Sequence, residues 1–270
     1  MSAHVVLIDA LNLIRRIYAV QERPFLFNGE LAPNTQQQVL HNTVQACSQA
    51  LSNILGLLKP THALAVFDSE VPCFRYDIYP DYKKGRAKMP SHLSDKMNDI
   101  QDVFLELGVD SLVPEEDEAD DVIATLSIKV ALRNQDVTIV STDKAFLMLL
   151  NDNIKVFDYF NRRYLDEQYV AEKFSVSPNK LLDLWSLTGD TTNKIPGVEG
   201  IGQVTAAQLL DEYGSIAALK NAEQLKPSIK KKLDKCQENL TLSRQLLTLK
   251  QDIPLGFNLK DIRLPTRSPS

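Results

Sequence analysis

The feature that most constrains this chain is a set of four short apolar runs, each of which ends at an aspartate. The runs are HVVLI before Asp9, ALAVF before Asp68, VTIVST before Asp143 and IKVF before Asp158. Helical patterns separate them, at residues 35–58, 91–107, 119–132 and 144–150. Continuous apolar strands that alternate with helices are typical of a largely parallel sheet covered on both faces. We therefore expect an α/β fold.

These aspartates also indicate where a ligand would bind, because the site of an open α/β sheet lies beyond the carboxyl ends of its strands. Asp9, Asp68 and Asp143 are all expected at that edge. A single aspartate after a strand often does no more than start a turn. Three of them at one rim, close to a further acidic run, predict a shared cation site. Oxygen ligands of this kind favour Mg²⁺ or Mn²⁺ over zinc.

The further acidic run is EEDEADD (115–121), in which six of the seven residues are carboxylates. It follows an expected short strand, SLV (111–113), so the helix after it begins at the same edge. The simple interpretation is an acidic helix start, where each carboxylate contributes only ~0.3–1 kcal/mol. Like charges three or four residues apart on a helix cost stability, however. We therefore assign Glu118, Asp120 and Asp121 to the cation site, although the simple interpretation stays open.

The composition narrows the class of protein. The chain has 270 residues, 44% of them hydrophobic, which is enough for one large core or two domains. Its net charge of −5 excludes a uniformly basic nucleic-acid binder, so local patches would have to hold a polyanion. Three scattered cysteines and four dispersed histidines suggest neither a disulfide framework nor a zinc site. With no signal peptide and no apolar run of ~18 residues, we expect a cytoplasmic monomer that makes no use of a membrane.

A basic and aromatic segment lies between Asp68 and the acidic run. Residues 75–88, RYDIYPDYKKGRAK, contain five basic residues, two acidic residues and three tyrosines. Cations that hold phosphates and rings that stack on bases suit a nucleic-acid strand. A lysine-rich loop is also often only a solvated surface. The neighbouring acidic site favours the nucleic-acid interpretation.

The pattern changes after about residue 165, where the apolar strands stop. Helical patterns follow at residues 167–174, 178–188, 203–212, 215–220, 227–235 and 237–249. We expect an α/β domain at 1–165, a helical domain at 166–260 and a disordered polar tail at 261–270. A hairpin turn is expected at Asn28-Gly29, within a loop (22–35) that has no functional interpretation.

The helical part contains NKIPGVEGIGQVTAAQLL (193–210), in which glycines precede a helix that starts near Gln203 or Val204. Backbone N–H groups at a helix start bind anions such as phosphate. The pattern is that of a helix-hairpin-helix, which grips a DNA backbone without reading bases. The expected DNA contacts are Gly200, Ile201, Gly202, Gln203, Val204 and Thr205. The lysines between 226 and 235 form a basic helix that either follows phosphates or is simply solvated.

The order of these motifs resembles that of the structure-specific 5′ nucleases, the family of flap endonucleases and 5′→3′ exonucleases. The resemblance runs over residues 4–250 and rests on Asp9, the Asp68 turn, YKKGR (82–86), EADD (118–121), STDK (141–144) and IPGVEGIG (195–202). It implies a PIN-like α/β nuclease domain with a helical arch, followed by a helix-three-turn-helix domain. It also implies Mg²⁺-dependent cleavage of branched DNA near the base of a 5′ single-stranded flap.

The resemblance assigns roles to individual residues. The metal ligands that it implies are Asp9, Asp68, Glu118, Asp120, Asp121, Asp143 and Asp190. Lys83 and Arg86 would meet the scissile phosphate, with Lys84 beside them and Tyr82 as a ring on which a base could stack. A K⁺ ion would link the hairpin to a DNA phosphate through the carbonyls of Leu187, Thr188, Pro196, Val198 and Ile201.

Two departures from the family pattern concern a second metal ion. Ala145 stands where STDKD would place a carboxylate, and GDTTNK has Asn193 and Lys194 where GDSSDN has Asp and Asn. Two-ion hydrolysis uses one ion for the attacking water and another for the leaving oxygen. We therefore expect the second ion to bind weakly or only with DNA, and the Lys194 ammonium to occupy part of its place. This combination resembles short bacterial members of the family that lack a polymerase.

The resulting hypothesis is a Mg²⁺-dependent 5′ flap endonuclease with one strong metal site. The main alternative is a branched-DNA-binding module with little or no catalysis, because the second site is damaged. An RNA-cleaving nuclease of the PIN class is more distant, since the hairpin pattern points to duplex DNA. A phosphoaspartate phosphatase is disfavoured because Asp9 is followed by Ala-Leu and not by a DxD pattern.

Overall fold

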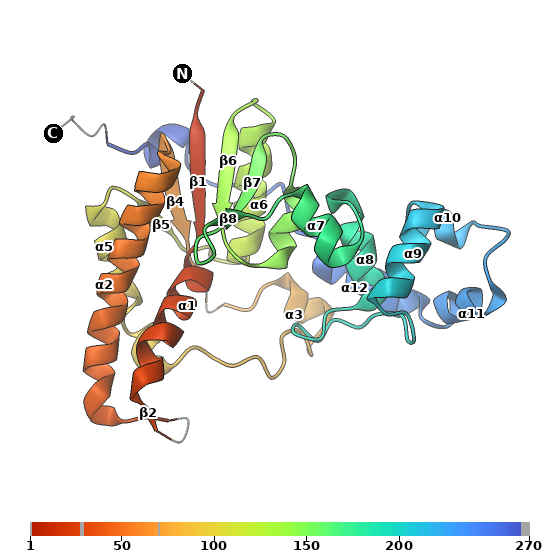
Figure 1. Cartoon of the computed structure of the whole chain (residues 1–270), viewed down its shortest axis with the longest axis horizontal. Coiled ribbons are helices and arrows are strands. Elements are labelled where there is room, and N and C mark those ends of the chain that lie inside the picture. Colours follow the sequence, from red (N-terminus) through yellow and green to blue (C-terminus); the bar gives the residue numbers. More distant parts are fainter. Residues whose placement is uncertain (1, 28–29, 70, 266–270) are drawn as a thin grey trace.

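The computed structural model describes residues 2–27, 30–69 and 71–265. A six-stranded sheet lies at its centre, in the order β5-β4-β1-β6-β7-β8 (Figure 1). The strands are β1 (His4–Asp9), β4 (His62–Val66), β5 (Asp110–Leu112), β6 (Asp136–Val140), β7 (Ile154–Asp158) and β8 (Arg163–Tyr164). All neighbours pair in parallel except β7 and β8. The largely parallel α/β sheet expected from the sequence is confirmed.

The register of the central strands brings their carboxyl ends to one edge. Asp9, the last residue of β1, lies opposite the last residue of β4, two residues before Asp68. Its neighbour Ile8 lies opposite the last residue of β6, three residues before Asp143. The three strand-end aspartates therefore lie at the edge where an open α/β sheet binds its ligand.

The alternation of side chains along β1 divides the core in two. Val6 and Ile8 belong to the apolar cluster formed with α1 (Ala10–Glu22), α2 (Pro33–Leu58) and α5 (Met97–Glu106). Val5 and Leu7 belong to the cluster formed with α6 (Ala119–Ala131) and the helical half of the chain. Successive side chains of a strand point to opposite faces. A strand that is apolar at every position therefore supplies both cores.

Some helices of the first half differ in detail from the sequence pattern. The helix expected at 91–107 is divided into α4 (Ser91–Ser94) and α5, and the one expected at 144–150 is a 3₁₀ helix, η2 (Lys144–Leu149). A short 3₁₀ turn, η1 (Arg23–Phe25), precedes β2 (Leu26–Phe27), which pairs antiparallel with β3 (Glu30–Leu31). The turn expected at Asn28-Gly29 lies outside the described residues.

The basic and aromatic segment contains less helix than a helical arch would. It begins with α3 (Phe74–Ile78), and α4 follows after a stretch of turns and extended chain over residues 79–90. Figure 1 shows this stretch passing below the sheet, between the lower ends of the helices of the first half and the helical half. The segment therefore borders the carboxyl edge of the strands.

The second half of the chain is helical, as expected. Its elements are α7 (Glu167–Phe174), η3 (Pro178–Lys180), α8 (Leu181–Thr188), α9 (Gln203–Tyr213), α10 (Ile216–Lys220), α11 (Pro227–Lys235) and α12 (Gln237–Leu247). Its apolar side chains join the same cluster as α6, so the two halves share one continuous core. The domain boundary at 165/166 stays a prediction.

The C-terminal segment is more ordered than its composition suggested. After α12 the chain runs back along α6, where the Thr125 hydroxyl donates to the carbonyl of Lys250 (3.2 Å) and the Lys129 ammonium donates to that of Ile253 (2.7 Å). It then forms the 3₁₀ helix η4 (Leu259–Ile262), and Arg263 pairs with the start of β4. The expectation of disorder from residue 261 was therefore wrong for 261–265, and residues 266–270 lie outside the described residues.

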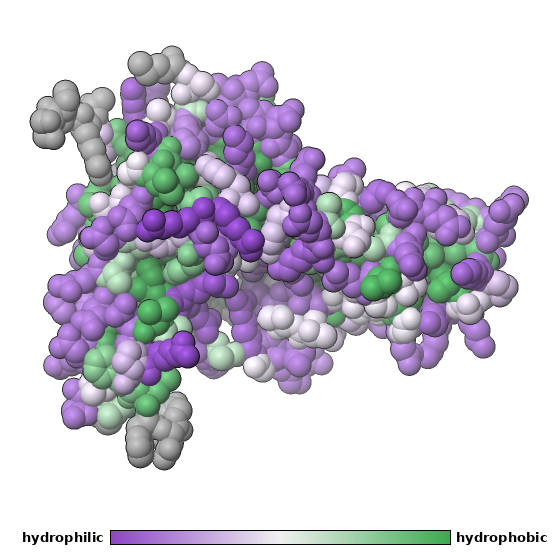
Figure 2. Space-filling view, in the orientation of Figure 1, coloured by the Kyte–Doolittle hydropathy of each residue, from purple (hydrophilic) through white to green (hydrophobic). Residues whose placement is uncertain are grey.

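Figure 2 shows a mainly hydrophilic face on which hydrophobic residues form small, separate groups. Among the described residues, no helix is both long and apolar enough to cross a bilayer.

Candidate active site

A cleft of about 1070 Å³ lies at the carboxyl edge of the sheet and contains most of the metal-binding and phosphate-contacting residues expected from the sequence. Its acidic lining residues are Asp9, Asp68, Glu118, Asp120, Asp143 and Asp190. Its basic lining residues are Arg15, Arg16, Arg75, Lys83, Lys84, Arg86, Lys88 and Lys144. The structure thus brings together six of the seven expected metal residues, and Asp121 is the one that it places elsewhere.

The strand-end carboxylates are oriented by the starts of the elements that follow them. Asp9 caps α1 by accepting from the backbone N–H of Asn12 (3.3 Å), and its other oxygen accepts from the Ser141 hydroxyl (2.6 Å). Asp143 caps η2 through the N–H of Ala145 (2.8 Å). Aspartate is favoured at such positions because its short side chain reaches the unpaired N–H groups of a helix start. The capping bonds hold the carboxylates in place beside the cleft.

Neighbouring positive charges do not fully balance the negative charges of these carboxylates. The pKa of Asp9 is raised to about 7, chiefly by burial and also by the nearby charges of Asp143 and Asp68. The pKa of Asp120 is raised well above its usual range by partial desolvation in the cleft and by the charges of Asp143, Asp9 and Asp68. Mutual repulsion of this kind disfavours the ionised form. A bound cation would remove it.

The donor set fits a hydrated divalent ion better than a fully protein-bound one. Among the described residues, no three acidic, histidine or cysteine side chains are gathered so that they would hold one metal ion directly. Mg²⁺ usually keeps several waters and is bound through only one or two carboxylates. The negative charges of three residues, Asp9, Asp120 and Asp143, repel one another across the cleft. These residues could hold such an ion through direct and water-mediated contacts.

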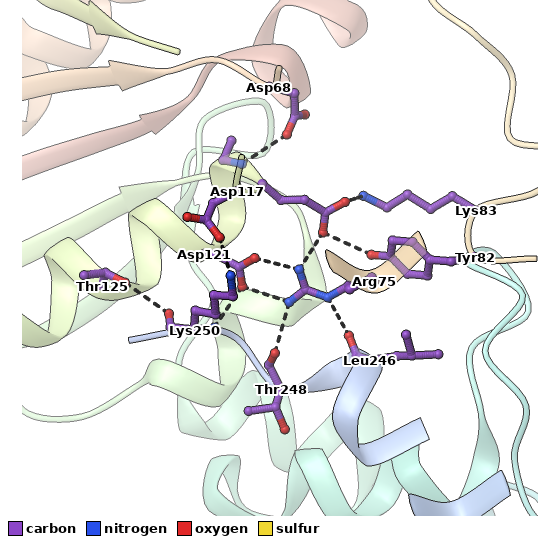
Figure 3. Close-up of polar contacts among 12 residues, drawn as sticks. Asp68, Arg75, Tyr82, Lys83, Asp117, Asp121, Thr125, Leu246, Thr248 and Lys250 are labelled. Atoms are coloured by element: carbon purple, nitrogen blue, oxygen red, sulfur yellow. Dashed lines mark hydrogen bonds and ion pairs between the residues drawn. The ribbon is translucent and has the colours of Figure 1, made fainter. Parts of the chain in front are cut away.

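Glu118 lies in the same cleft but already has cationic partners. Its carboxylate accepts from the Lys83 ammonium (2.5 Å), from Nη1 of Arg75 (2.9 Å) and from the Tyr82 hydroxyl (3.1 Å). Figure 3 labels these three donors. Burial alone would raise the pKa of Glu118, but Lys83 and Arg75 outweigh that effect and lower it. Glu118 therefore links the acidic wall of the cleft to the basic segment.

Asp121 has a structural environment, which corrects its assignment as a metal ligand. Its side chain is fully buried and receives two hydrogen bonds from the Arg75 guanidinium, at 2.6 and 2.8 Å (Figure 3). The backbone N–H of Lys250 also donates to it (2.9 Å). Asp121 and Asp120 are adjacent on a helix that turns about 100° per residue, so they face different directions. Asp121 binds the basic segment and the C-terminal segment to α6.

Tyr82 is also corrected, because it is not free to stack on a base. Only 5% of its surface is exposed, its hydroxyl donates to Glu118, and the edge of its ring contacts Tyr76 at a centroid distance of 5.4 Å. Tyr76 is 36% exposed and lines the cleft. Of the two rings, Tyr76 is the one that a nucleotide could reach.

The basic side of the cleft is larger than the sequence indicated. Lys83 and Arg86 line it as expected, and the backbone N–H of Lys83 donates to the carbonyl of Asn193 (2.9 Å) in the hairpin segment. Arg15 and Arg16 of α1 were missed. The Arg15 guanidinium donates to the carbonyl of Ala87 (2.9 Å) and so holds the basic segment against α1. The signal was present in the sequence, because α1 begins directly after Asp9 and its early turns stay near the rim.

The hairpin segment is built on a close backbone crossing. A Cβ atom on Gly197 would lie 2.4 Å from the carbonyl carbon of Thr188 and 2.5 Å from the nitrogen of Gly189, so no side chain fits there. The N–H of Val198 donates to the carbonyl of Leu187 (2.7 Å) across this crossing. The five carbonyls expected to bind K⁺ come from the two chain segments that cross here and from Ile201 just beyond them.

The expected DNA contacts surround the start of α9. Gly202 is the residue before its first turn, and Val204 in that turn is 73% exposed. The side chain of Ile201 is 4% exposed, so only its backbone could meet a ligand. The Lys232 ammonium of α11 donates to the carbonyl of Gly200 (2.8 Å), which fixes part of the basic helix against the hairpin.

Asp190 receives donors from three directions. Its carboxylate accepts from the N–H of Thr192 (3.0 Å), from the Asn193 amide (3.3 Å) and from the Lys144 ammonium (3.1 Å). Lys194, which was expected near this place, is exposed and does not line the cleft. The cation beside Asp190 is therefore Lys144, and the expectation for Lys194 was wrong.

Comparison with known proteins agrees with this arrangement. A family model described as "5'-3' exonuclease, N-terminal resolvase-like domain" matches residues 4–175, and one described as "5'-3' exonuclease, C-terminal SAM fold" matches residues 176–270. A protein of Colwellia psychrerythraea named flap endonuclease Xni is 62% identical over 99% of this chain and 94% of its own. A protein of the same name from Aeromonas hydrophila is 44% identical over 97% of this chain and 96% of its own.

Solved structures share the fold at low identity. T5 5′-exonuclease with bound zinc superposes with a TM-score of 0.74 at 19% identity, over 91% of this chain and 89% of that one. The catalytic core of Rad2 in complex with a DNA substrate gives 0.54 at 14% identity, over 96% and 83%. The expected fold, a PIN-like sheet domain followed by a helical domain, is confirmed. Together with the two family matches, these likenesses show that the chain belongs to the 5′-3′ exonuclease family, in a group whose bacterial members are named flap endonuclease Xni.

Proposed function

We propose that this protein is a Mg²⁺-dependent, structure-specific 5′ flap endonuclease, which hydrolyses a phosphodiester bond near the junction of single- and double-stranded DNA. The observation that carries the proposal is the cleft itself. One wall holds carboxylates with raised pKa values, and the opposite segment presents Lys83 and Arg86. A cation bound at the carboxylate wall and a phosphate bound at the basic segment would balance the charges of both.

The acidic wall would hold the metal. Asp9, Asp68, Asp120 and Asp143 are the residues that would bind it, with Glu118 at their edge. When bound, a divalent ion supplies Lewis-acid activation of water and charge neutralisation at the phosphate. The capping bonds of Asp9 and Asp143 hold these two carboxylates in place, so little reorganisation accompanies binding.

The basic wall would hold the scissile phosphate. Lys83 and Arg86 lie beside the acidic wall, and ammonium and guanidinium groups stabilise negative charge that builds up on a phosphate during hydrolysis. Lys83 must leave Glu118 to do so, because its ammonium is paired there at 2.5 Å. An incoming phosphate would replace Glu118 as the partner of Lys83. An incoming metal ion would replace Lys83 as the partner of Glu118.

The hairpin before α9 would grip the duplex beside the cut. Exposed backbone N–H groups at the start of a helix suit a phosphate, and Val204 and Thr205 stand at that start. A K⁺ ion on the crossing carbonyls would add charge that the loop itself lacks. The hydrogen bond from the Lys83 N–H to the Asn193 carbonyl joins this hairpin to the basic segment, so the duplex grip would lie next to the phosphate contacts.

A branched-DNA-binding module with little catalysis remains the second candidate, because Ala145 and Asn193 take the places of two carboxylates on the second-ion side. The two are separated by incubating the purified protein with end-labelled 5′-flap, 3′-flap and linear duplex DNA, with and without Mg²⁺. A flap endonuclease releases a product from the 5′ flap only with Mg²⁺. Tight flap binding with no product at any Mg²⁺ concentration would support the binding module instead.

A further inference from the structure

The second-ion side of the cleft already contains a cation that belongs to the protein. The Lys144 ammonium lies 3.1 Å from Oδ2 of Asp190, and the side chain of Asp190 is only 4% exposed. The same ammonium lies 5.1 Å from the centre of the Trp185 ring, a distance at which a cation is attracted to an aromatic face. A carboxylate on one side and a ring on the other thus fix the position of one positive charge.

The Asn193 amide completes this arrangement. Its nitrogen donates to Oδ2 of Asp190 (3.3 Å), while its oxygen is buried without a hydrogen-bond partner among the described residues. An aspartate in place of Asn193 would bring a second carboxylate next to Asp190, and the two would need a divalent ion between them. With an amide there, a single positive charge is enough to balance Asp190.

We propose that the Lys144 ammonium, with the Asn193 amide, takes the place of a second divalent ion beside Asp190. The inference rests on the proposed function, since it assigns how this nuclease balances charge where a second ion would bind. Asp190 is then a partner of Lys144 and not a metal ligand. The chain holds one divalent ion, among Asp9, Asp68, Asp120 and Asp143, and carries a fixed cation on the other side of the cleft.

The position of Lys144 also suits contact with DNA. Its side chain is 39% exposed and lines the cleft, so the ammonium can bind a phosphate while it stays near Asp190. A monovalent ammonium attracts a phosphate without the need for a free metal ion. The affinity for DNA should therefore depend on the divalent-ion concentration as expected for one bound ion and not for two.

Counting bound Mn²⁺ tests the inference without DNA and without activity. Calorimetric titration of the wild-type protein with Mn²⁺ should give one site. Lys144→Met removes the cation and leaves Asp190 uncompensated, so a second Mn²⁺ should bind at least about tenfold more tightly than any second ion of the wild type, a change that corresponds to ~1.4 kcal/mol. Lys144→Arg keeps the charge and should behave as wild type.

Lys194→Met is the matched control, because Lys194 directly follows Asn193 but is exposed and lies outside the cleft. It should leave the Mn²⁺ isotherm unchanged. The double variant Lys144→Met with Asp190→Asn removes both charges and should return to one site. A purely structural pair between Lys144 and Asp190 would change only the thermal unfolding of these variants and not the number of bound ions.

Two results would overturn the inference. One is a Lys144→Met isotherm that matches wild type in a folded protein, as judged by circular dichroism. The other needs no change at Lys144: Asp190→Asn alone should keep wild-type Mn²⁺ binding, and weaker binding would show that Asp190 is a metal ligand after all. Flap cleavage by the wild type is measured separately, so failure of the charge assignment would leave the proposed function standing.

Discussion

Arg75 is the residue whose loss should damage this fold most, although it lies in a segment that the sequence indicated as a nucleic-acid contact. Its guanidinium is 1% exposed and donates to Asp121 twice, to Glu118, and to the backbone carbonyls of Leu246 (2.8 Å) and Thr248 (3.0 Å) (Figure 3). One side chain thus joins the basic segment, α6 and the end of α12. The prediction concerns Arg75→Met, which keeps much of the side-chain volume and removes the charge.

The expected loss of stability comes from the buried charge and the backbone carbonyls that lose Arg75 as their partner. Breaking a buried ion pair by removing one partner costs ~3–5 kcal/mol, because the other charge is left uncompensated. Asp121 is that charge, and it has no exposed surface. The two carbonyls that lose a donor would add ~1–3 kcal/mol each if water could not replace Arg75. We expect Arg75→Met to lower the free energy of unfolding by about 4 kcal/mol or more, against a total of ~5–15 kcal/mol.

Equilibrium unfolding in guanidinium chloride, followed by circular dichroism, measures this loss. Lys84→Ala is the matched control, because Lys84 belongs to the same segment and pairs only with Asp81 on the surface. It should unfold at the wild-type midpoint. Adding Asp121→Leu to Arg75→Met should recover part of the lost stability, since the buried charge is then gone. A loss below about 1 kcal/mol for Arg75→Met, or no recovery in the double variant, would refute the reasoning.

Three further predictions concern the rest of the site. Tyr82→Phe should lower stability by ~1 kcal/mol through the lost bond to Glu118 and leave flap-DNA affinity unchanged in fluorescence anisotropy, because the ring is buried. Gly197→Ala should lower the unfolding temperature and weaken flap binding, since its Cβ would meet the Thr188 backbone at 2.4 Å. Val204→Glu should weaken flap binding without shifting the unfolding temperature, because that side chain is 73% exposed.

The strand ends of this protein could be predicted because their signals are local. An apolar run followed by an aspartate marks both the end of a buried strand and the start of the next helix, and parallel strands share one edge. Asp9, Asp68 and Asp143 were therefore placed correctly at the cleft from the sequence. The helices of the second half were found for the same reason, since their periodicity lies within each segment.

The partners of the remaining side chains could not be predicted, because they are distant in sequence. Tyr82 and Glu118 are 36 residues apart, and Arg75 meets the C-terminal segment more than 170 residues later. Asp120 and Asp121 looked equivalent in the run EADD, and only the direction of α6 relative to the sheet separates the metal side from the Arg75 side. Lys144 was overlooked because its partner, Asp190, belongs to the other half of the chain.

The central claim is that the carboxylates of the cleft hold the ion with which this protein cuts flaps, and one pair of variants tests it most directly. Asp120 lines the cleft, whereas Asp117 of the same acidic run pairs with Lys250 (2.6 Å) outside it. The measurement is single-turnover cleavage of an end-labelled 5′ flap in Mg²⁺ by the wild type, Asp120→Asn and Asp117→Asn, with flap affinity measured in parallel. The account predicts junction cleavage by the wild type and Asp117→Asn, and a loss of at least about a hundredfold with retained flap binding for Asp120→Asn. Equal cleavage rates for Asp120→Asn and the wild type would contradict it.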